Sequence, residues 1–255
     1  MSVQQTIELV RALKLYGALE AYQDLLNNSS LQDLPYNEQM AYVFDGERRY
    51  RENRKLANLS RAARAKIGSA CPEDIEYSAE RGLEKSRMLE YLSCDWITQG
   101  RNLIITAPTG CGKTYLSCAM GQQAARKGLS WAYKRFPDLL DELQLAHKNG
   151  SYAKLRAKLA KLRLLVMDDW AMAPLTDQSR RELLDVVDDR IGTGAMLITS
   201  QLPVEGWHDY VSEGSIGGKT LADAIVDRIS HNARYIQLKG ESQRKLRAQR
   251  SRSAS

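Results

Sequence analysis

The sequence predicts an α/β protein in which a parallel sheet is sandwiched by helices and preceded by a small helical N-terminal domain. Two stretches carry this prediction. The first is an apolar run at 103–105 that leads into Ala107-Pro-Thr-Gly-Cys-Gly-Lys-Thr114 and then into a helix-like segment, the order strand, phosphate-binding loop, helix. The second is an apolar strand at 162–169 whose last two residues are acidic. An apolar run of this kind is typical of a buried strand in a parallel sheet.

Residues 1–66 are predicted to form the helical N-terminal domain, because apolar residues recur at helical spacing over 6–26 and further helices follow over 35–66. Basic residues crowd the end of this region. They are Arg48, Arg49, Arg51, Arg54, Lys55, Arg61, Arg64 and Lys66. With the two acids of 47–66 they leave a net charge of +6, as large as that of the whole chain. A solvated helix face and a surface for a polyanion both account for this imbalance.

The rest of the chain divides into a predicted linker at 67–99, a nucleotide-binding domain at 100–240 and a basic tail at 241–255. Within the domain we expect further strands at 129–136, 195–200 and 233–238, and helices at 137–146, 152–162, 177–191 and 221–230. Gly217-Gly-Lys-Thr220 repeats part of the phosphate-binding loop, but no buried strand precedes it. We interpret it as a loop that leads into a helix at Leu221.

The residue types of the phosphate-binding loop match its chemistry. Gly110 and Gly112 allow a tight turn whose backbone N–H groups point inward at phosphates. Lys113 brings a positive charge to the β and γ phosphates, and the Thr114 hydroxyl is a ligand for Mg²⁺. The predicted nucleotide-binding residues are Ala107, Pro108, Thr109, Gly110, Cys111, Gly112, Lys113 and Thr114. Ala107 stands where the strict pattern has glycine.

The acidic strand end about fifty residues later fits a Walker B motif. Asp168 is predicted to hold Mg²⁺ through its water shell, and Asp169 to orient or polarise the attacking water. The alternative is an acidic strand end that only starts a turn. A polar residue at the end of the strand at 195–200 can reach the γ-phosphate or the catalytic water from the side, and both Ser200 and Gln201 fit this position.

Composition narrows the class of protein. No apolar run approaches the length of a membrane span, and the N-terminus lacks the pattern of a signal peptide, so no membrane association is expected. The four cysteines and three histidines are scattered without metal-ligand spacing. This predicts neither a zinc site nor a disulfide framework, and it fits the reducing cytoplasm.

Several motifs stand in one order along nearly the whole chain. After the phosphate-binding loop and the paired acids come TSQLP at 199–203, DRI at 227–229 and GESQR at 240–244, and DIEYSAERGL lies upstream at 74–83. Together with the helical N-terminal block, this pattern resembles the IstB-like transposition helper ATPases. These are AAA+ proteins that accompany an insertion-sequence transposase and are related to the DnaC-type helicase loaders.

The resemblance implies roles for individual residues. Lys113 and Thr114 would bind ATP with Mg²⁺, and Asp168 and Asp169 would be the Walker B pair. Gln201 stands where the family usually has a sensor Asn. Two arginines complete the implied set: Arg228 as the finger that enters a neighbouring subunit's site, and Arg244 as a second sensor. Ala107 and Gln201 depart from the family pattern and bear on the rate of hydrolysis more than on ATP binding.

The resemblance also implies partners. An arginine finger acts between subunits, so a homo-oligomeric ring or spiral closed by ATP is expected. Such an assembly would grip and bend double-stranded DNA non-specifically and recruit or activate the cognate transposase. The residues expected to contact DNA are Arg48, Arg49, Arg51, Arg54, Lys55, Arg61 and Arg64.

Three other interpretations remain open at this point. A helicase loader would share the fold but would grip a replicative helicase and favour single-stranded DNA. A metabolic P-loop kinase would need a substrate pocket and a phosphate-clamping lid, and no motif for either stands out in the sequence. A DNA-binding protein with an inactive nucleotide site would bind ATP without turnover.

Overall fold

The structure is a computed structural model that describes residues 2–215 and 217–240. The chain divides into two compact units, Met1–Asn58 and Leu59–Ser255. This division differs from the boundary expected after residue 66. The tail predicted at 241–255, which includes Arg244, lies outside the described residues. Within the described ranges, no helix is both long and apolar enough to cross a membrane.

The first unit is helical, as the sequence predicts. It contains α1 (Val3–Ala12), α2 (Tyr16–Asn27) and α3 (Ser29–Gln32), and α4 (Tyr36–Ala63) begins in it. The single helix expected over 6–26 is broken into α1 and α2, because Lys14 adopts a left-handed backbone with φ +58°. The segment 35–66, expected as one or two helices, forms the single helix α4.

A buried carboxylate ties α4 to α2. Glu47 accepts hydrogen bonds from the backbone N–H groups of Gly17 (2.9 Å) and Ala18 (3.1 Å) and from Arg51 Nε (2.6 Å). Its negative charge therefore lies at the N-terminus of α2, where the helix dipole favours it. Burial acts to raise the pKa of Glu47, but these hydrogen bonds outweigh it and hold the pKa below its ordinary value.

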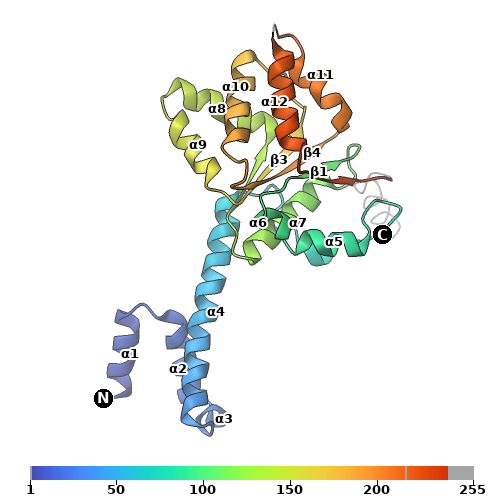
Figure 1. The fold of residues 1–255 in the computed structure, drawn as a ribbon. Coiled ribbons are helices and arrows are strands. Elements are labelled where there is room, and N and C mark those ends of the chain that lie inside the picture. The colour runs from blue at the N-terminus through green and yellow to red at the C-terminus, as the bar shows by residue number, and fades with distance from the viewer. Residues whose placement is uncertain (1, 216, 241–255) are drawn as a thin grey trace, which may run out of the picture. The chain divides into compact units, whose positions relative to one another are not determined.

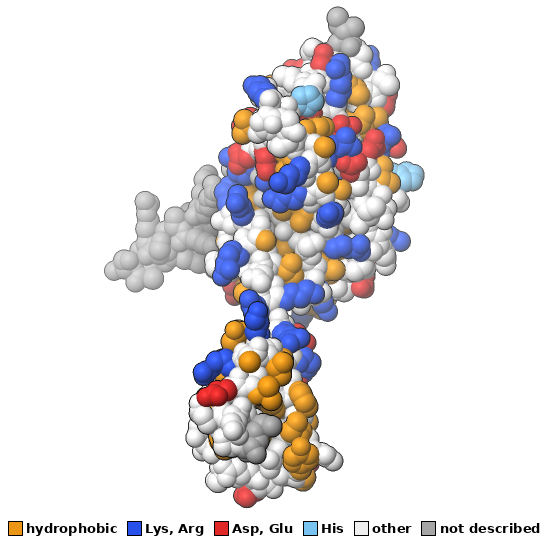
Figure 2. Space-filling view, turned by 90° about the vertical axis from the view of Figure 1, so that its left-hand side faces the viewer, with side chains coloured by type: hydrophobic (Ala, Val, Ile, Leu, Met, Phe, Trp, Pro, Cys, Tyr) orange, Lys and Arg blue, Asp and Glu red, His pale blue; other side chains and the backbone are white. Residues whose placement is uncertain are grey.

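The first unit also keeps large apolar side chains in solvent. Leu9, Leu13, Tyr36 and Phe44 are all exposed, while its buried apolar residues come chiefly from α2. Figure 2 shows orange side chains gathered at the surface of this unit. A helical unit of this size therefore buries only a small core of its own.

The second unit is built on a five-stranded parallel sheet, which confirms the predicted fold class. The strands are β1 (Leu103–Thr106), β2 (Trp131–Arg135), β3 (Leu164–Trp170), β4 (Ala195–Ser200) and β5 (Arg234–Gln237). Their order across the sheet is β2-β3-β4-β1-β5, and every neighbouring pair is parallel. All five strands therefore end at one edge, where ligands bind in open α/β sheets.

Helices cover both faces of this sheet (Figure 1). On one side lie α5 (Lys85–Leu92), α6 (Asp95–Thr98) and α7 (Lys113–Arg126). On the other lie α8 (Phe136–Lys148), α9 (Tyr152–Ala160), α10 (Asp177–Asp188), α11 (Trp207–Ser212) and α12 (Gly218–Ser230). Because side chains alternate along a strand, Leu165 and Met167 of β3 join the core under α8 to α12, and Val166 points to the α7 face.

Two element boundaries differ from the prediction for local reasons. The strand expected at 162–169 runs from Leu164 to Trp170, and its pairing with β4 shifts register after Met167, where Asp169 has φ +63°. The helix expected from Leu221 begins at Gly218, because Gly217 adopts φ +88° and caps it. The second GKT sequence is therefore the first turn of α12 and not part of a loop.

Residues 67–99 pack into the second unit, although the sequence indicates a linker. A short 3₁₀ helix (Pro72–Asp74) is followed by α5 and α6, and Ile75, Met88, Trp96 and Ile97 are buried. Gly82, at φ +77°, lies so close to β5 that an added Cβ would come within 2.1 Å of the Gln237 carbonyl oxygen. The segment is thus held against the strand that flanks the phosphate-binding loop.

Candidate nucleotide-binding site

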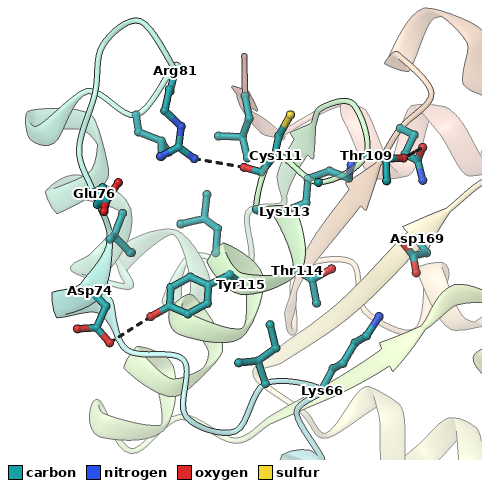
Figure 3. A pocket seen from close by; sticks show the side chains of 18 of the residues that line it. Lys66, Asp74, Glu76, Arg81, Thr109, Cys111, Lys113, Thr114, Tyr115 and Asp169 are labelled. Atoms are coloured by element: carbon teal, nitrogen blue, oxygen red, sulfur yellow. Dashed lines mark hydrogen bonds between the residues drawn. The ribbon is translucent and has the colours of Figure 1, made fainter. Parts of the chain in front are cut away.

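A cavity of about 360 Å³ opens beside the phosphate-binding loop (Figure 3). This volume lies within the range of small-molecule sites. Its walls come from three parts of the second unit: the loop and start of α7, the segment 66–83, and the residues at the carboxyl ends of β3, β4 and β5. The predicted residues Thr109, Gly110, Cys111, Gly112, Lys113, Thr114, Asp169 and Gln201 all line it.

The phosphate-binding loop adopts a left-handed backbone at its two glycines. Gly110 and Gly112 have φ of +86° and +98°, and Gly112 caps α7, whose first residue is Lys113. The N-terminus of a fourteen-residue helix therefore faces the cavity and favours an anion there. Ala107 is buried, and its N–H donates to the Ser200 carbonyl oxygen at 3.1 Å. The loop thus starts from a fixed point between β1 and β4.

Lys113 is held inside the loop. Its ammonium group donates to the carbonyl oxygens of Ala107 (2.6 Å) and Pro108 (3.0 Å), and only 7% of the residue is exposed. Burial lowers the pKa of Lys113, while the carboxylates of Asp168 and Asp169 act in the opposite direction. The site therefore contains a positive charge on a fixed stem, at the position that the sequence predicts.

Asp168 is a fully buried carboxylate surrounded by hydroxyl groups. Thr114 Oγ1 donates to its Oδ2 at 2.8 Å, Tyr133 Oη donates to the same oxygen at 2.5 Å, and Thr199 Oγ1 donates to Oδ1. Burial and the bond to Asp168 raise the pKa of Tyr133 far above its ordinary value, so this phenol stays a donor. No described cation forms an ion pair with Asp168.

The oxygen atoms of Thr114 and Asp168 suit a hard divalent cation. Thr114 and Asp168 offer only oxygen atoms, the ligands that Mg²⁺ prefers, and they already lie within hydrogen-bonding distance of each other. Burial of an unpaired carboxylate is costly unless a cation or several donors compensate for it. The residues present therefore fit Mg²⁺ beside the start of α7.

Asp169 faces the cavity from the end of β3. Its backbone N–H donates to Thr199 Oγ1 at 3.2 Å, and its left-handed φ turns the chain so that its carboxylate is 20% exposed. Arg135, at the end of β2, donates from Nε to Asp169 Oδ2 at 3.2 Å. This bond raises the pKa of Arg135. Neighbouring acids on one strand thus have different surroundings, Asp168 among hydroxyls and Asp169 beside a guanidinium.

Of the two polar candidates at the end of β4, Gln201 is the one that reaches the site. Thr109 Oγ1 donates to Gln201 Oε1 at 2.5 Å, whereas the buried Ser200 hydroxyl donates to the Leu202 carbonyl oxygen. Because β4 lies between β1 and β3, Gln201 emerges between the phosphate-binding loop and Asp169. The structure thus brings together residues from three strand ends.

Arg228 is not part of this cavity. It lies in the last turn of α12, where its guanidinium forms an ion pair with Asp188 at the end of α10. Its backbone carbonyl oxygen accepts a long bond from Asn102 Nδ2 (3.4 Å). Within the chain, Arg228 is therefore held away from the P-loop.

The basic residues of α4, together with Arg64 directly after it, fall into two groups. Arg48 and Arg49 pair with Asp45, and Arg51 pairs with the buried Glu47. Arg54, Lys55, Arg61 and Arg64 are exposed and form no ion pair with a described residue. The first group therefore has less free charge to offer a polyanion than the sequence alone suggests.

Arg135 and four further residues near the site were not singled out from the sequence. Tyr133 and Thr199 support Asp168, and Tyr115 and Arg81 join the segment 66–83 to the loop. A polar residue inside an otherwise apolar strand is a usable signal, and Thr199 in AMLITS gives it. Arg81 gives none, because its role depends on a contact with Cys111 across thirty residues.

Solved structures define the class of protein. The crystal structure of the DnaC helicase loader matches with a TM-score of 0.55 at 18% identity, covering 67% of this chain and 97% of that chain. The structure of the replication initiator DnaA bound to AMPPCP and single-stranded DNA matches with a TM-score of 0.56 at 16% identity, covering 72% and 55%. At these identities the likeness concerns the fold alone, and that fold is the AAA+ fold.

The chain belongs to the family of IstB-like ATP-binding proteins, whose family model matches residues 8–253. Protein y4pL of Sinorhizobium fredii, which is named as an insertion-sequence ATP-binding protein, is 39% identical over 251 residues. The match covers 98% of this chain and 100% of the relative. The family resemblance inferred from the motifs is thereby confirmed.

Proposed function

We propose that the protein hydrolyses ATP with Mg²⁺, assembles on double-stranded DNA and assists the transposase of an insertion sequence. The observation that carries the proposal is the convergence of Lys113, Asp169 and Gln201 on one cavity, with the Thr114–Asp168 pair beside it. Family membership favours an insertion-sequence role over a helicase loader or a metabolic kinase. A DNA-stimulated ATPase assay tests it, and the absence of turnover with or without DNA would contradict the catalytic part.

The chain's own groups suggest how the chemistry proceeds. The N–H groups of the loop and the Lys113 ammonium would bind the polyphosphate, and Thr114 and Asp168 would hold Mg²⁺. When bound, the metal ion neutralises charge on the phosphates. Asp169 would accept a hydrogen bond from the attacking water and orient it in line with the γ-phosphate. Gln201, fixed by Thr109, would contact the γ-phosphate or the water from the side.

The other end of the cavity fits a nucleoside. Ile67, Ile75, Leu83, Leu116 and Leu238 line it and supply apolar surface for a flat base. Polar groups at the same walls come from Asp74 and Tyr115. We place the adenine at this end and the γ-phosphate at the end marked by Asp169.

We further propose that Arg228 completes the site of a neighbouring subunit in a homo-oligomer. Arg228→Ala is expected to lower ATP turnover roughly a thousandfold or more, because the cation that stabilises charge on the transferred phosphoryl group is removed. Arg181→Ala is the matched control, since Arg181 is an exposed arginine of α10 outside the cavity. Steady-state ATPase measurements at a concentration that supports assembly compare the two.

Mixing separates action between subunits from action within one. Arg228→Ala and Lys113→Ala proteins are each inactive in this scheme, but a mixed interface can pair an intact P-loop with an intact arginine. Turnover is therefore expected to recover partly as the two are combined. A complete lack of recovery at every mixing ratio argues against a finger supplied by the neighbour.

DNA binding is expected to depend on the basic side chains of α4 that form no ion pair with a described residue. Arg54→Gln/Lys55→Gln should make the log–log dependence of duplex affinity on salt shallower by about 1.8, because each phosphate that is no longer neutralised lowers the slope by about 0.9. The matched control Arg48→Gln/Arg49→Gln removes the same charge from two arginines that the carboxylates of Asp45 and Glu52 already offset, so its effect should be smaller. Duplex titrations at several salt concentrations provide the slopes.

Phosphate contacts carry no sequence information, so the decrease in affinity should be the same for unrelated duplexes. ATP binding should persist, because Arg54 and Lys55 belong to the first unit and the cavity to the second. If both double variants keep the wild-type slope, α4 is not the DNA surface. The alternative is then a docking face for the transposase or a neighbouring subunit.

A further inference from the structure

Residues 71–83, which we call the strap, border the nucleotide cavity and are fastened to the rest of the second unit at both ends. At the first end, Tyr115 Oη lies 3.3 Å from the backbone of Cys71 and donates to Asp74 Oδ2 at 3.3 Å. At the other end, the Lys239 N–H donates to the Arg81 carbonyl oxygen at 3.1 Å. Its backbone is therefore positioned independently of any ligand.

Arg81 extends from the fixed end of the strap over the phosphate-binding loop. Its Nη2 donates to the Cys111 carbonyl oxygen at 3.3 Å and would lie 3.9 Å from a Cβ added to Gly112. Its Cγ would lie 3.7 Å from a Cβ added to Gly240. Both glycines therefore lie within ordinary van der Waals distance of the arginine side chain. Figure 3 shows its guanidinium beside Cys111, with Asp169 on the other side of the loop.

Among the residues that the structure describes, the Arg81 guanidinium has hydrogen-bond donors without a partner. Arginine carries five N–H donors, and one of them is engaged with Cys111. No described carboxylate forms an ion pair with Arg81, although the side chain is only half-buried and lines the cavity. The guanidinium presents planar, forked N–H donors beside the cavity, which the N-terminus of α7 also faces. Donors of this geometry suit the oxygens of a phosphate group.

Resting on the proposed ATP site, we propose that Arg81 contacts the α- and β-phosphates of the bound nucleotide in the same subunit. The backbone of a P-loop cradles these two phosphates, and Arg81 lies beside Cys111 and Gly112 of that backbone. The γ-phosphate belongs at the opposite end, beside Asp169 and Gln201. ADP therefore retains every contact that Arg81 makes with ATP.

The test measures the dissociation constants of ADP and ATP by calorimetry. Arg81→Met keeps the apolar stem over Gly240 and removes the charge. The variant is expected to raise the dissociation constants of ADP and ATP about tenfold or more and by similar factors, because a charge-assisted hydrogen bond to each nucleotide is lost. Arg81→Lys should recover part of this affinity. Arg87→Met is the matched control, because Arg87 is an exposed arginine of α5 outside the cavity.

A purely structural role for Arg81 gives a different result. If Arg81 only fastened the loop through Cys111, the Arg81→Met variant would have a lower midpoint of thermal unfolding without nucleotide. We expect this midpoint to stay at the wild-type value. A wild-type ADP affinity in Arg81→Met, a loss confined to ATP, or a lowered midpoint without nucleotide each overturns the inference. Failure of the wild-type protein to bind either nucleotide overturns the proposed function as well, and that outcome is recognised before any variant is compared.

Discussion

Lys113→Ala is expected to abolish ATP binding. The Lys113 ammonium is the charge at the heart of the loop, where it lies 2.6 Å from the Ala107 carbonyl oxygen and close to Asp168 and Asp169. Without Lys113, the triphosphate is repelled by these two carboxylates and no lysine offsets their negative charge. Equilibrium binding of labelled ATP measures the effect, and assembly that depends on ATP should disappear with it.

The chain contains its own control for this experiment. Lys219 is the second residue of α12, and Lys113 is the first residue of α7. The caps of the two helices, Gly217 and Gly112, have φ of +88° and +98°. Lys219 is exposed and lies outside the cavity. Lys219→Ala should therefore bind ATP like the wild type. Unchanged binding in Lys113→Ala would show that the P-loop assignment is wrong.

The two GKT sequences also show what local sequence can and cannot predict. Both lie at the start of a helix that a left-handed glycine caps. The cap is Gly112 of the first sequence itself, and Gly217 immediately before the second. Only the first follows a strand of the sheet, so only its N–H groups face the ligand edge. The preceding apolar run correctly predicted a strand before the first sequence and none before the second, while the local geometry of the second was missed.

Contacts between distant residues account for most of what the sequence did not predict. Asp168 was predicted from its place at the end of an apolar strand, but its partner Tyr133 is 35 residues away and Thr199 is 31 residues away. Parallel strands bring such residues together only once the order β2-β3-β4 is known. The pairing of β3 with β4 and β2 is a long-range property that no short motif contains.

The strap illustrates the same limit. Its glycine and charged residues are typical of a linker, and the sequence was interpreted in that way. What turns it into a cavity wall is the contact of Tyr115 with Cys71 and of Arg81 with Cys111, together with the fit of Gly82 against β5. These contacts join segments that are adjacent only after folding.

Asp169→Asn is expected to slow ATP turnover about a thousandfold while leaving ATP binding intact. The amide keeps the shape of the side chain but cannot accept a proton or hold the attacking water with a negative charge, a change of the size associated with losing a general base. Binding should persist because Asp168 and Thr114, on the buried side of the site, are unchanged. Single-turnover hydrolysis, compared with equilibrium binding of ATP, separates the two effects.

Arg135 supplies the control for this variant. It contacts Asp169 at 3.2 Å and Asp138 at 3.8 Å, so Asp138→Asn alters a carboxylate beside the same guanidinium without touching the cavity. If the position of Arg135 were what matters, both variants would slow turnover. We expect only Asp169→Asn to do so, and to leave longer-lived complexes on DNA because bound ATP persists. Normal turnover in Asp169→Asn would assign the orientation of water to another group at this edge, of which Gln201 is the nearest candidate by position.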